Sequence, residues 1–586
     1  MIPATKNPSG THQSELRAAL ADFHRAFVSL GVFSCFINLL MIVPSIYMLQ
    51  VYDRVLASRN QTTLIMLTLI MLAAYLLMSF LEFVRAYTLI RLSSRLDSKL
   101  VDRVFKAAFE QNLKVPGSNA GQSLHDLMGV RQFLTGNGLF AFFDAPWFPF
   151  YAIVIFLFHP VLCYVAMGGA AMLVGLTYLT EKLTKTPLSE ANKLNMAASN
   201  FATNNLRNAE VIESMGMLPN VQSRWYEMHT KHLHWQAIAS DRAAIISQSS
   251  KFIRMTLQSL MLGIGAFLVI KGEMTPGGMI AASILSGRML APVELAIGSW
   301  KQLVSARSSW NRLELLLHHF PRQDKGMALP KPKGLVQAEN VVAGAPGSKM
   351  AIIKGVSFVI QPGEVVAILG ASASGKTTLA RLLVGVWPTL NGKVRLDGSD
   401  IYTWNKTDLG PSMGYLPQDI ELFDGTLAEN ICRFGEVDSE KVVSAAQRAG
   451  VHEIILRLPN GYDTKIGANS GALSGGQRQR VGLARAMYGD PSFIVLDEPN
   501  SNLDDAGEAA LVRAILDLKS QGTTVIVISH RVSTLVAADK IMVMREGTIA
   551  AFGPRDEILA SLQQATQQAG RQPQGNAPAQ IENHAA

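Results

Sequence analysis

Six long apolar runs lie in the first half of the sequence, and they constrain its fold more than any other feature. A helix needs about 20 consecutive apolar residues to cross the hydrocarbon core of a bilayer. In lipid, a spanning segment must also satisfy its own backbone hydrogen bonds, as a helix does. We therefore predict an α-helical transmembrane domain with six spans. The predicted spans are Phe27–Leu49, Thr62–Leu81, Phe133–Phe158, Val161–Leu179, Phe252–Ile270 and Gly277–Leu295.

The composition agrees with a membrane protein. Hydrophobic residues make up 48% of the chain and charged residues 17%, and the mean hydropathy is +0.20. The cysteines, Cys35, Cys163 and Cys432, lie far apart, so their spacing predicts neither a zinc site nor a disulfide framework. The residues up to Arg25 are polar, and no small-residue cleavage site follows the first apolar run. This pattern predicts a retained membrane anchor rather than a cleaved signal peptide.

The connections between the spans alternate between short and long, and the long ones carry most of the basic residues. Residues 82–132 and 180–251 are rich in Lys and Arg. Because basic residues collect on the cytoplasmic side of a membrane, we expect both segments and both chain termini to face the cytoplasm. Few Gly or Pro residues interrupt these segments, which predicts two helical hairpins projecting into the cytoplasm. The net charge of +8 then reflects these segments rather than a nucleic-acid partner.

Two charged residues inside the predicted spans leave alternative interpretations open. Asp144 precedes Pro146 by two positions, so it can cap a helix that restarts there. A carboxylate at that depth is costly unless it faces water or a partner, so a broken helix that lines a pathway is the functional alternative. Arg288 can either extend its guanidinium to the interface or line a pore. Residues 168–175 predict close helix packing and no catalysis.

The second half of the sequence changes character after a polar, proline-containing linker. Apolar β-type runs alternate there with helical patterns, which is typical of an α/β domain. Beyond residue 562 the chain is rich in Gln, Ala and Pro and has too few apolar residues to fold. The predicted organisation is a polar segment (1–26), the transmembrane domain (27–315), a linker (316–335), an α/β P-loop nucleotide-binding domain (336–562) and a disordered tail (563–586).

A phosphate-binding loop lies near the start of the α/β domain. Residues 364–369 predict a buried strand, and Gly370-x-x-x-x-Gly375-Lys376-Thr377 matches the P-loop pattern at every fixed position. In such a loop, backbone N–H groups hold the phosphates of ATP, the lysine reaches the outer phosphates, and the hydroxyl binds Mg²⁺. The predicted ATP-binding residues are Gly370, Ala371, Ser372, Ala373, Ser374, Gly375, Lys376, Thr377 and Thr378.

Further motifs exclude an ordinary glycine-rich turn. Residues 493–497 form an apolar run that ends in Asp497, as a Walker B strand requires for Mg²⁺, and Glu498 follows as the candidate general base. The segment 473–477 opens a helix whose N-terminal amides suit a phosphate. The predicted catalytic residues are Glu498, His530 and Gln418; the predicted metal ligands are Thr377, Gln418 and Asp497; and Ser474, Gly475, Gly476 and Gln477 join the nucleotide-binding set.

In motif order and spacing, residues 336–562 resemble the nucleotide-binding domain of ABC transporters, with Walker A, Q-loop, signature, Walker B, D-loop and H-loop motifs. The resemblance implies a dimer, because the signature motif of one subunit closes over the ATP held by the other subunit's P-loop. The six spans resemble the exporter type, which places coupling elbows near Gln111–Leu124 and Asn208–Met217. Two positions depart from the family. Ala345 stands where an aromatic residue usually stacks on adenine, and Ala468 stands where exporters often carry a glutamate that contacts the elbows.

Within that family, four segments resemble the inner-membrane ATPases of type I secretion systems, and most closely the protease and lipase exporters. They are Pro44–Val55, Phe143–Trp147, Asn208–Met217 and Glu498–Asp504. The resemblance implies a homodimer in the bacterial inner membrane that exports an unfolded polypeptide with a periplasmic adaptor and an outer-membrane channel. Too few residues precede the first span for the peptidase-like domain of some relatives, so leader-peptide cleavage is not expected.

Two other functions remain as alternatives. A lipid or hydrophobic-drug exporter would share every feature of the cassette and would differ by a lateral opening to the bilayer. An ATP-gated channel or regulator would use the cassette as a switch, and the intact Glu498 and His530 argue against it. The six spans exclude a soluble ABC ATPase that acts on DNA or ribosomes.

Overall fold

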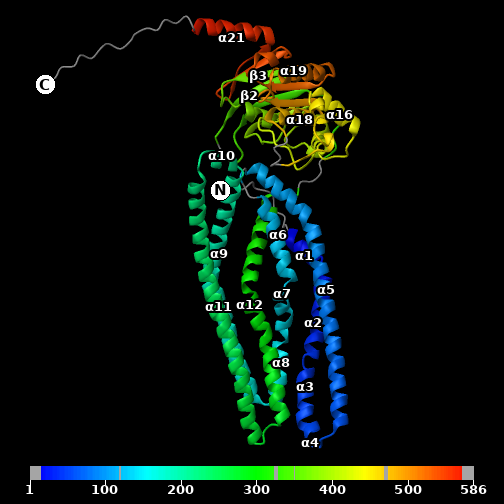
Figure 1. Cartoon of the computed structure of the whole chain (residues 1–586), viewed down its shortest axis with the longest axis vertical. Coiled ribbons are helices and arrows are strands. Elements are labelled where there is room, and N and C mark those ends of the chain that lie inside the picture. Colours follow the sequence, from blue (N-terminus) through cyan, green and yellow to red (C-terminus); the bar gives the residue numbers. More distant parts are fainter. Residues whose placement is uncertain are drawn as a thin grey trace, which may run out of the picture. The chain divides into compact units, whose positions relative to one another are not determined.

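The computed structural model describes residues 15–115, 117, 120–322, 327–348, 350–467 and 473–569. These residues form two compact units, a helical one built mainly from residues before 323 and an α/β one built mainly from residues after it (Figure 1). Ala468 lies outside the described residues, so its predicted effect on coupling stays a prediction.

The helical unit is dominated by a few very long helices. Its elements are α1 (Glu15–Ala21), α2 (His24–Leu40), α3 (Val43–Gln50), the π-helical η1 (Val51–Val55), α4 (Leu56–Ser58), α5 (Gln61–Lys114), α6 (Ala120–Thr135), α7 (Asn137–Asp144), the 3₁₀ turn η2 (Ala145–Trp147), α8 (Phe148–Phe158), α9 (Pro160–Leu206), α10 (Ala209–Ser214), α11 (Leu218–Ile270) and α12 (Pro276–His319).

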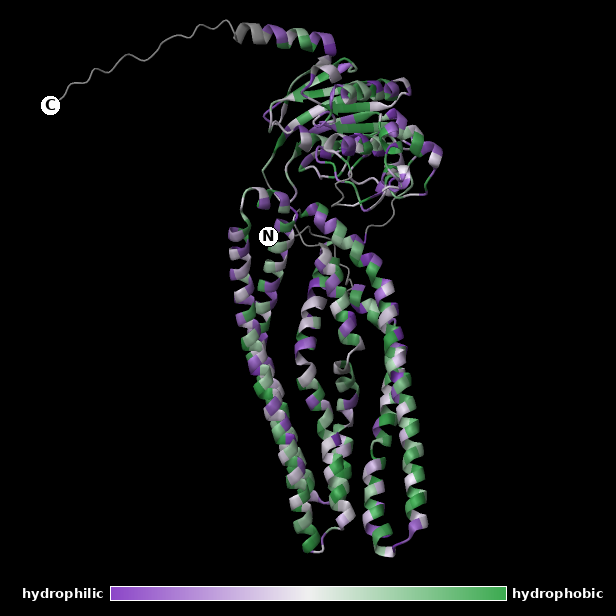
Figure 2. Cartoon of the chain, in the orientation of Figure 1, coloured by the Kyte–Doolittle hydropathy of each residue, from purple (hydrophilic) through white to green (hydrophobic). Residues whose placement is uncertain are grey.

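Within the described part of the chain, six helical segments are long and apolar enough to cross a membrane, which confirms the predicted number of spans. On α5, large apolar side chains such as Leu69, Ile70 and Leu76 are exposed, as expected of a surface that contacts lipid. Figure 2 shows such residues gathered toward the ends of the helices that short turns join. The 54 residues of α5 extend for about 80 Å, whereas the hydrocarbon core is about 30 Å thick. Helix α5 is therefore much longer than a membrane span, as the predicted helical extensions require.

One charge in the fifth span forms an ion pair with one charge in the sixth. Arg254 on α11 lies 2.6 Å from Glu294 on α12, which removes the cost of placing either charge alone among apolar helices. Helix α12 continues through Pro292 without a break. Arg288 is half-buried on the same helix, and both interpretations of its role remain predictions.

The third span contains the 3₁₀ turn η2 between α7 and α8, and Asp144 pairs with residues of other spans instead of capping a helix. Its side chain makes no capping hydrogen bond to the turn η2, so the predicted cap is wrong. Instead, one of its oxygens lies 3.3 Å from Arg85 of α5 and accepts a hydrogen bond from Asn38 of α2 at 2.9 Å. Arg85 also lies over the ring of Phe140. One carboxylate thus joins three spans, because a buried charge is tolerated only with partners.

A second long-range polar contact joins the first and last spans. The side chain of Asp53, in the π-helical turn η1, accepts a hydrogen bond at 2.8 Å from the backbone N–H of Gly277 in the first turn of α12. A carboxylate is favourable there because the N-terminus of a helix carries partial positive charge. A Cβ at Gly277 would lie 2.7 Å from the Asp53 carboxylate, so this close approach requires glycine.

The predicted glycine-mediated helix packing occurs at one position of its segment. A Cβ at Gly169 of α9 would collide with Leu257 of α11, whereas Gly168 and Gly175 face open space. Around this contact, Ala166, Ala170 and Met261 belong to a buried apolar cluster shared by α8, α9, α11 and α12. Gly169 therefore allows α9 and α11 to approach closely.

In its described residues, the α/β unit contains three sheets and the helices that cover them. Its strands are β1 (Val336–Ala343), β2 (Ile353–Ile360), β3 (Val365–Gly370), β4 (Asn391–Leu396), β5 (Ser399–Asp400), β6 (Met413–Leu416), β7 (Gly425–Thr426), β8 (Lys465–Ile466), β9 (Phe493–Asp497), β10 (Thr524–Ile528), β11 (Lys540–Arg545) and β12 (Thr548–Pro554). Its helices are α13 (Lys376–Leu383), α14 (Lys406–Leu409), η3 (Gly410–Ser412), α15 (Leu427–Ile431), α16 (Ser439–Arg448), α17 (His452–Leu456), η4 (Gly461–Asp463), α18 (Gly475–Met487), α19 (Asp505–Ser520), α20 (Val532–Leu535) and α21 (Arg555–Ala569).

The central sheet has six strands in the order β12-β11-β3-β10-β9-β6, and all neighbours are parallel except β12 with β11. Both faces of this sheet are buried. In β3, Val365 and Ala367 pack into one apolar cluster, while Val366 and Ile368 pack into another. Continuous apolar strands are typical of a parallel sheet covered on both sides. The antiparallel sheet β2-β1-β4-β5 contributes to the second cluster.

The end of the described chain differs slightly from the prediction. Helix α21 continues to Ala569, beyond residue 562 where the sequence predicts the disordered tail to begin. A Gln- and Ala-rich segment retains helix propensity, which explains why the helix extends past its last apolar residues. Residues 570–586 lie outside the described residues.

The buried ion pair of the third span gives a stability prediction. In Asp144→Ala, Arg85 loses its counter-charge, and removing one partner of a buried pair costs about 3–5 kcal/mol. Asp102→Ala on α5 is the matched control, since its pair with Lys106 is exposed and exposed pairs contribute at most about 1 kcal/mol. Thermal unfolding of the purified variants in detergent checks this. Equal unfolding temperatures for the two variants would contradict the buried-pair account.

Candidate ATP-hydrolysis site

Four of the predicted motifs meet because the strands that carry them are neighbours. In the central sheet, β3, β10, β9 and β6 lie side by side and parallel. The register pairs Leu416 with Leu496, so Gln418 and Glu498 leave the sheet at the same level. It also pairs Asp497 with Ile528, so His530 emerges next to Glu498. Ligands bind beyond the carboxyl ends of such strands in open α/β sheets.

The phosphate-binding loop connects β3 to α13 and depends on two glycines. Gly370 has φ +157, and a Cβ there would collide with the carbonyl oxygen of Met544 and lie 2.7 Å from Ser374 Oγ. Gly375 precedes α13 with φ +97, a conformation that other residues rarely adopt. The loop therefore turns tightly and directs the first amides of α13 toward one point, where a phosphate is favourable.

Lys376 lies folded against the loop that precedes it. Its Nζ donates hydrogen bonds to the carbonyl oxygens of Gly370 at 2.8 Å and Ala371 at 2.9 Å. Burial lowers the pKa of this ammonium group, while the charges of Glu498 and Asp497 act in the opposite direction. Ala371, Ser372 and Ala373 form the exposed rim of the loop, and Ser374 and Thr378 are buried. The predicted P-loop residues thus form one continuous cradle.

Asp497 is fully buried at the end of β9. Burial raises the pKa of its carboxyl group to about 6, with the Thr377 side chain acting in the opposite direction. Among the described residues, neither carboxylate oxygen has a hydrogen-bond partner of good geometry. Such an unpaired group is costly in a protein interior. A carboxylate and a nearby hydroxyl are the oxygen donors that Mg²⁺ prefers, so this pair fits a magnesium ion.

Glu498 stands between the two other predicted catalytic residues. Gln418 Nε2 donates a hydrogen bond to Glu498 Oε2 at 3.0 Å, and His530 Nε2 lies 3.7 Å from Glu498 Oε1. Glu498 has φ +50, a strained conformation for a non-glycine residue that is found at functional sites. Its backbone N–H donates to the carbonyl oxygen of Ile528 at 3.0 Å. The carboxylate is therefore held at a fixed position between an amide and an imidazole.

The signature segment begins helix α18. Ser474 caps the helix, accepting a hydrogen bond from the N–H of Gln477 at 3.3 Å, and the Gln477 side chain accepts one from Ser474 N–H at 2.9 Å. This capping box satisfies two terminal N–H groups. The amides of Gly475 and Gly476 lie in the first turn, where helix geometry favours an anion. A Cβ at Gly476 would lie 2.6 Å from the carbonyl oxygen of Asn502.

Sequence reasoning missed Gln479, which links α18 to the Walker B segment. This side chain is 2% exposed. It donates to the carbonyl oxygen of Glu498 at 3.1 Å and accepts from the N–H of Asn502 at 3.0 Å. Gln479 lies one turn before Leu483, on the face of α18 that the helical period predicts to be buried. A polar residue on that face could have indicated a buried polar contact.

Ala345 stands at the position where the family resemblance predicts an aromatic residue that stacks on adenine. Ala345 lies in the turn between β1 and β2, where its carbonyl oxygen accepts a hydrogen bond from Ser348 N–H at 2.9 Å. A methyl side chain has no π-face on which a base could stack. The turn therefore presents a methyl group at Ala345 and no aromatic ring on which adenine could stack.

Comparison with known proteins identifies the class. Residues 27–293 match the family model for the ABC transporter transmembrane region, and residues 353–501 match that for ABC transporters. The chain also resembles a solved bacterial Atm1-family ABC exporter with ATP bound, with a TM-score of 0.80, 21% identity, and coverage of 96% of this chain and 100% of the other. This likeness supports the exporter fold. The chain belongs to the ABC transporter family and is a multi-pass membrane protein with an ATP-binding domain.

Two relatives narrow the class. The chain is 46% identical over 547 residues to the type I secretion system ATP-binding protein PrsD of Rhizobium meliloti (strain 1021), covering 93% of this chain and 94% of PrsD. It is 29% identical over 550 residues to the toxin RTX-I translocation ATP-binding protein of Actinobacillus pleuropneumoniae, covering 92% of this chain and 77% of that protein. These similarities confirm the predicted resemblance to type I secretion proteins and indicate an ATPase coupled to transport.

The shape of the phosphate loop gives a prediction about nucleotide binding. In Gly370→Ala, the new Cβ collides with Met544 and the loop must shift, so we expect ATP affinity to fall at least about tenfold, or 1.4 kcal/mol. Gly410→Ala is the control, because nothing lies within 4 Å of a Cβ there. A fluorescent ATP analogue titrated into each folded variant measures the affinity. Unchanged binding by Gly370→Ala would contradict the predicted role of the loop.

Proposed function

We propose that this chain is the inner-membrane ATPase of a type I secretion system and moves an unfolded polypeptide out of the cytoplasm. The single observation that carries this proposal is the 46% identity to a type I secretion ATP-binding protein along 93% of the chain. Both units take part in that similarity, so it concerns the membrane half as well as the cassette. Similarity to a toxin translocation protein points to the same kind of cargo.

The geometry supports a role for each residue in ATP hydrolysis. Glu498 is the general base, because its carboxylate is fixed and only part-buried, so water can reach it. Gln418 orients that carboxylate through its amide. His530 approaches from the adjacent strand and senses the terminal phosphate. These three groups act in one place because their strands are neighbours in the sheet.

The P-loop and the signature segment hold the nucleotide in this proposal. Lys376 and the amides of residues 370–378 bind the phosphates, and residues 474–477 contact ATP from a second subunit. Thr377, Gln418 and Asp497 would hold Mg²⁺. When bound, this ion neutralises charge on the phosphate oxygens during transfer. The unpaired carboxylate of Asp497 is the feature that favours it.

The family resemblance and the placement of the two nucleotide-binding motifs support a dimer. Within one chain, α18 packs against β6, whereas the P-loop follows β3, and β10 and β9 lie between them. The two motifs are thus carried by different elements of the α/β unit, and the family resemblance implies that the signature segment contacts the nucleotide held by a second copy. A second copy that supplies its signature segment completes the site. We therefore propose a homodimer with two competent sites, since each chain carries Glu498.

The membrane half supports export across the inner membrane. The basic residues of the helical extensions favour a cytoplasmic location for these segments and both termini. The proposed coupling elbow at residues 111–124 includes the end of α5 and the start of α6, and the one at residues 208–217 includes α10. In the proposed system, a periplasmic adaptor and an outer-membrane channel receive the polypeptide. Alternating access, driven by cassette closure with ATP and reopening after hydrolysis, moves the cargo.

The proposed role of Glu498 as general base can be tested by substitution. Glu498→Gln keeps the shape of the side chain but cannot accept a proton, so the variant binds ATP and hydrolyses it at least about 100-fold more slowly. We expect it to accumulate as a closed, ATP-loaded dimer, detectable by retained nucleotide after gel filtration. Glu436→Gln, at an exposed position, is the control. Turnover near the wild-type rate in Glu498→Gln would contradict the base assignment.

The type of cargo is tested in the bacterium that carries this chain. We expect one or more polypeptides to disappear from the culture medium of a deletion strain. They should return with the wild-type chain or Glu436→Gln, but not with Glu498→Gln at equal expression. Quantitative mass spectrometry of the medium measures this. An unchanged set of extracellular proteins, together with an altered lipid composition or drug sensitivity, would favour the lipid or drug exporter instead.

A further inference from the structure

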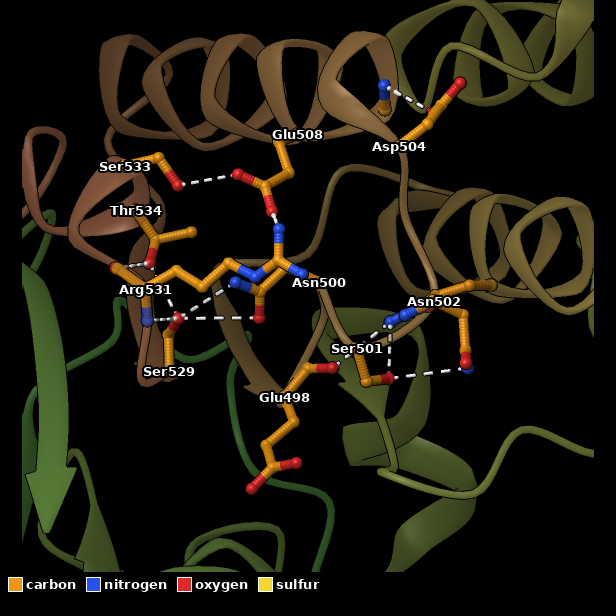
Figure 3. A network of polar contacts seen from close by, with 12 residues as sticks. Glu498, Asn500, Ser501, Asn502, Asp504, Glu508, Ser529, Arg531, Ser533 and Thr534 are labelled. Carbon is orange, nitrogen blue, oxygen red and sulfur yellow. Dashed lines mark hydrogen bonds and ion pairs between the residues drawn. The ribbon is translucent and has the colours of Figure 1, made fainter.

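A buried polar cluster includes Ser529, the residue that precedes His530 in the chain (Figure 3). It consists of Asn500, Ser529 and Thr534, whose exposed fractions are 4%, 0% and 2%. Asn500 follows Glu498 by two positions in the chain, and Ser529 immediately precedes His530. The cluster therefore connects the segment that carries the proposed base with the segment that carries the histidine.

The Ser529 hydroxyl is the meeting point of this cluster. Asn500 Nδ2 donates to Ser529 Oγ at 3.3 Å, and the backbone N–H of Arg531 donates to the same oxygen at 3.1 Å. The Thr534 hydroxyl lies 2.8 Å from Ser529 Oγ and 2.8 Å from the carbonyl oxygen of Arg531. Because buried polar groups that lose their partners cost free energy, these contacts fix the backbone on both sides of His530.

A second anchor holds the residue after His530. The Arg531 guanidinium forms an ion pair with Glu508 on α19, and the Ser533 hydroxyl donates to the other Glu508 oxygen at 3.0 Å. Figure 3 shows the Asn500 amide directed toward Ser529 and the Glu498 carboxylate directed away from it. The imidazole of His530 remains half-exposed, 3.7 Å from Glu498. Only the backbone on either side of this histidine is fixed by the cluster.

We propose that Asn500 is a positioning residue for ATP hydrolysis. Its amide sets the separation of Glu498 and His530 by holding Ser529, and it acts through the histidine rather than on the nucleotide. This inference rests on the proposed hydrolytic roles of Glu498 and His530. A displacement of about 1 Å between reacting groups can cost about 100-fold in rate, so a side chain that fixes this distance affects turnover without affecting binding.

A double-mutant cycle tests the proposal with the full-length chain in detergent or nanodiscs. Asn500→Ala should lower kcat for ATP about tenfold and change KM for ATP by less than about twofold, because nucleotide binding is untouched. His530→Ala should lower kcat further. The double variant should match His530→Ala, since the effect of Asn500 passes through the histidine. Ser529→Ala removes less side-chain volume and should lower kcat to the same extent as Asn500→Ala. If Asn500→Ala does not fold, Ser529→Ala replaces it in the cycle.

Thr523→Val is the matched control. Its hydroxyl donates a buried hydrogen bond to Pro491 at the opposite end of β10, so the variant loses a similar contact and some thermal stability but keeps kcat. If Asn500→Ala and His530→Ala lower kcat by independent, multiplicative factors, the proposed role of Asn500 is wrong, while that of His530 stands. A changed KM with unchanged kcat in Asn500→Ala would have the same meaning. A wild-type rate in His530→Ala would overturn both the inference and the proposed role of His530.

Discussion

The parallel register of three neighbouring strands is the constraint on which the ATP-binding half depends. Because Leu416 pairs with Leu496 and Asp497 pairs with Ile528, residues far apart in the sequence leave the sheet at one edge. A shift of one residue in either pairing would reverse which face each side chain points to. Every side chain of β9 and β10 is buried, so a shift would force these close-packed side chains to repack. Core packing thus holds the predicted catalytic residues Gln418, Glu498 and His530 at one edge of the sheet.

The membrane half is governed by a related constraint, the need to give every buried charge a partner. Arg85 with Asp144 and Arg254 with Glu294 each connect different spans. The Asp53 carboxylate likewise caps the start of α12 from the first span. In an apolar environment such pairs cost little when complete and much when broken. They specify which helices are neighbours, since apolar surfaces alone discriminate poorly between helices in lipid.

Local signals could be predicted from the sequence, and long-range partners could not. The six spans and the nucleotide-binding domain follow from runs and spacings within a few dozen residues, and both predictions are confirmed. The capping role of Asp144 was wrong because Arg85, its true partner, is distant in the chain. Gln479 and Asn500 were missed for a related reason. In the sequence each is an ordinary polar residue. Their partners, Glu498 for Gln479 and Ser529 for Asn500, are brought close only by the folded sheet.

The central claim is that hydrolysis at Glu498 drives the export of a polypeptide. The most direct measurement is steady-state ATP hydrolysis by the purified full-length chain in nanodiscs, with and without the polypeptide that a deletion strain fails to secrete. The account predicts continuous hydrolysis whose rate changes when the unfolded polypeptide is added, and no such change with the same polypeptide folded. Hydrolysis that ignores the polypeptide but responds to lipids or drugs, or the absence of steady turnover, would contradict it.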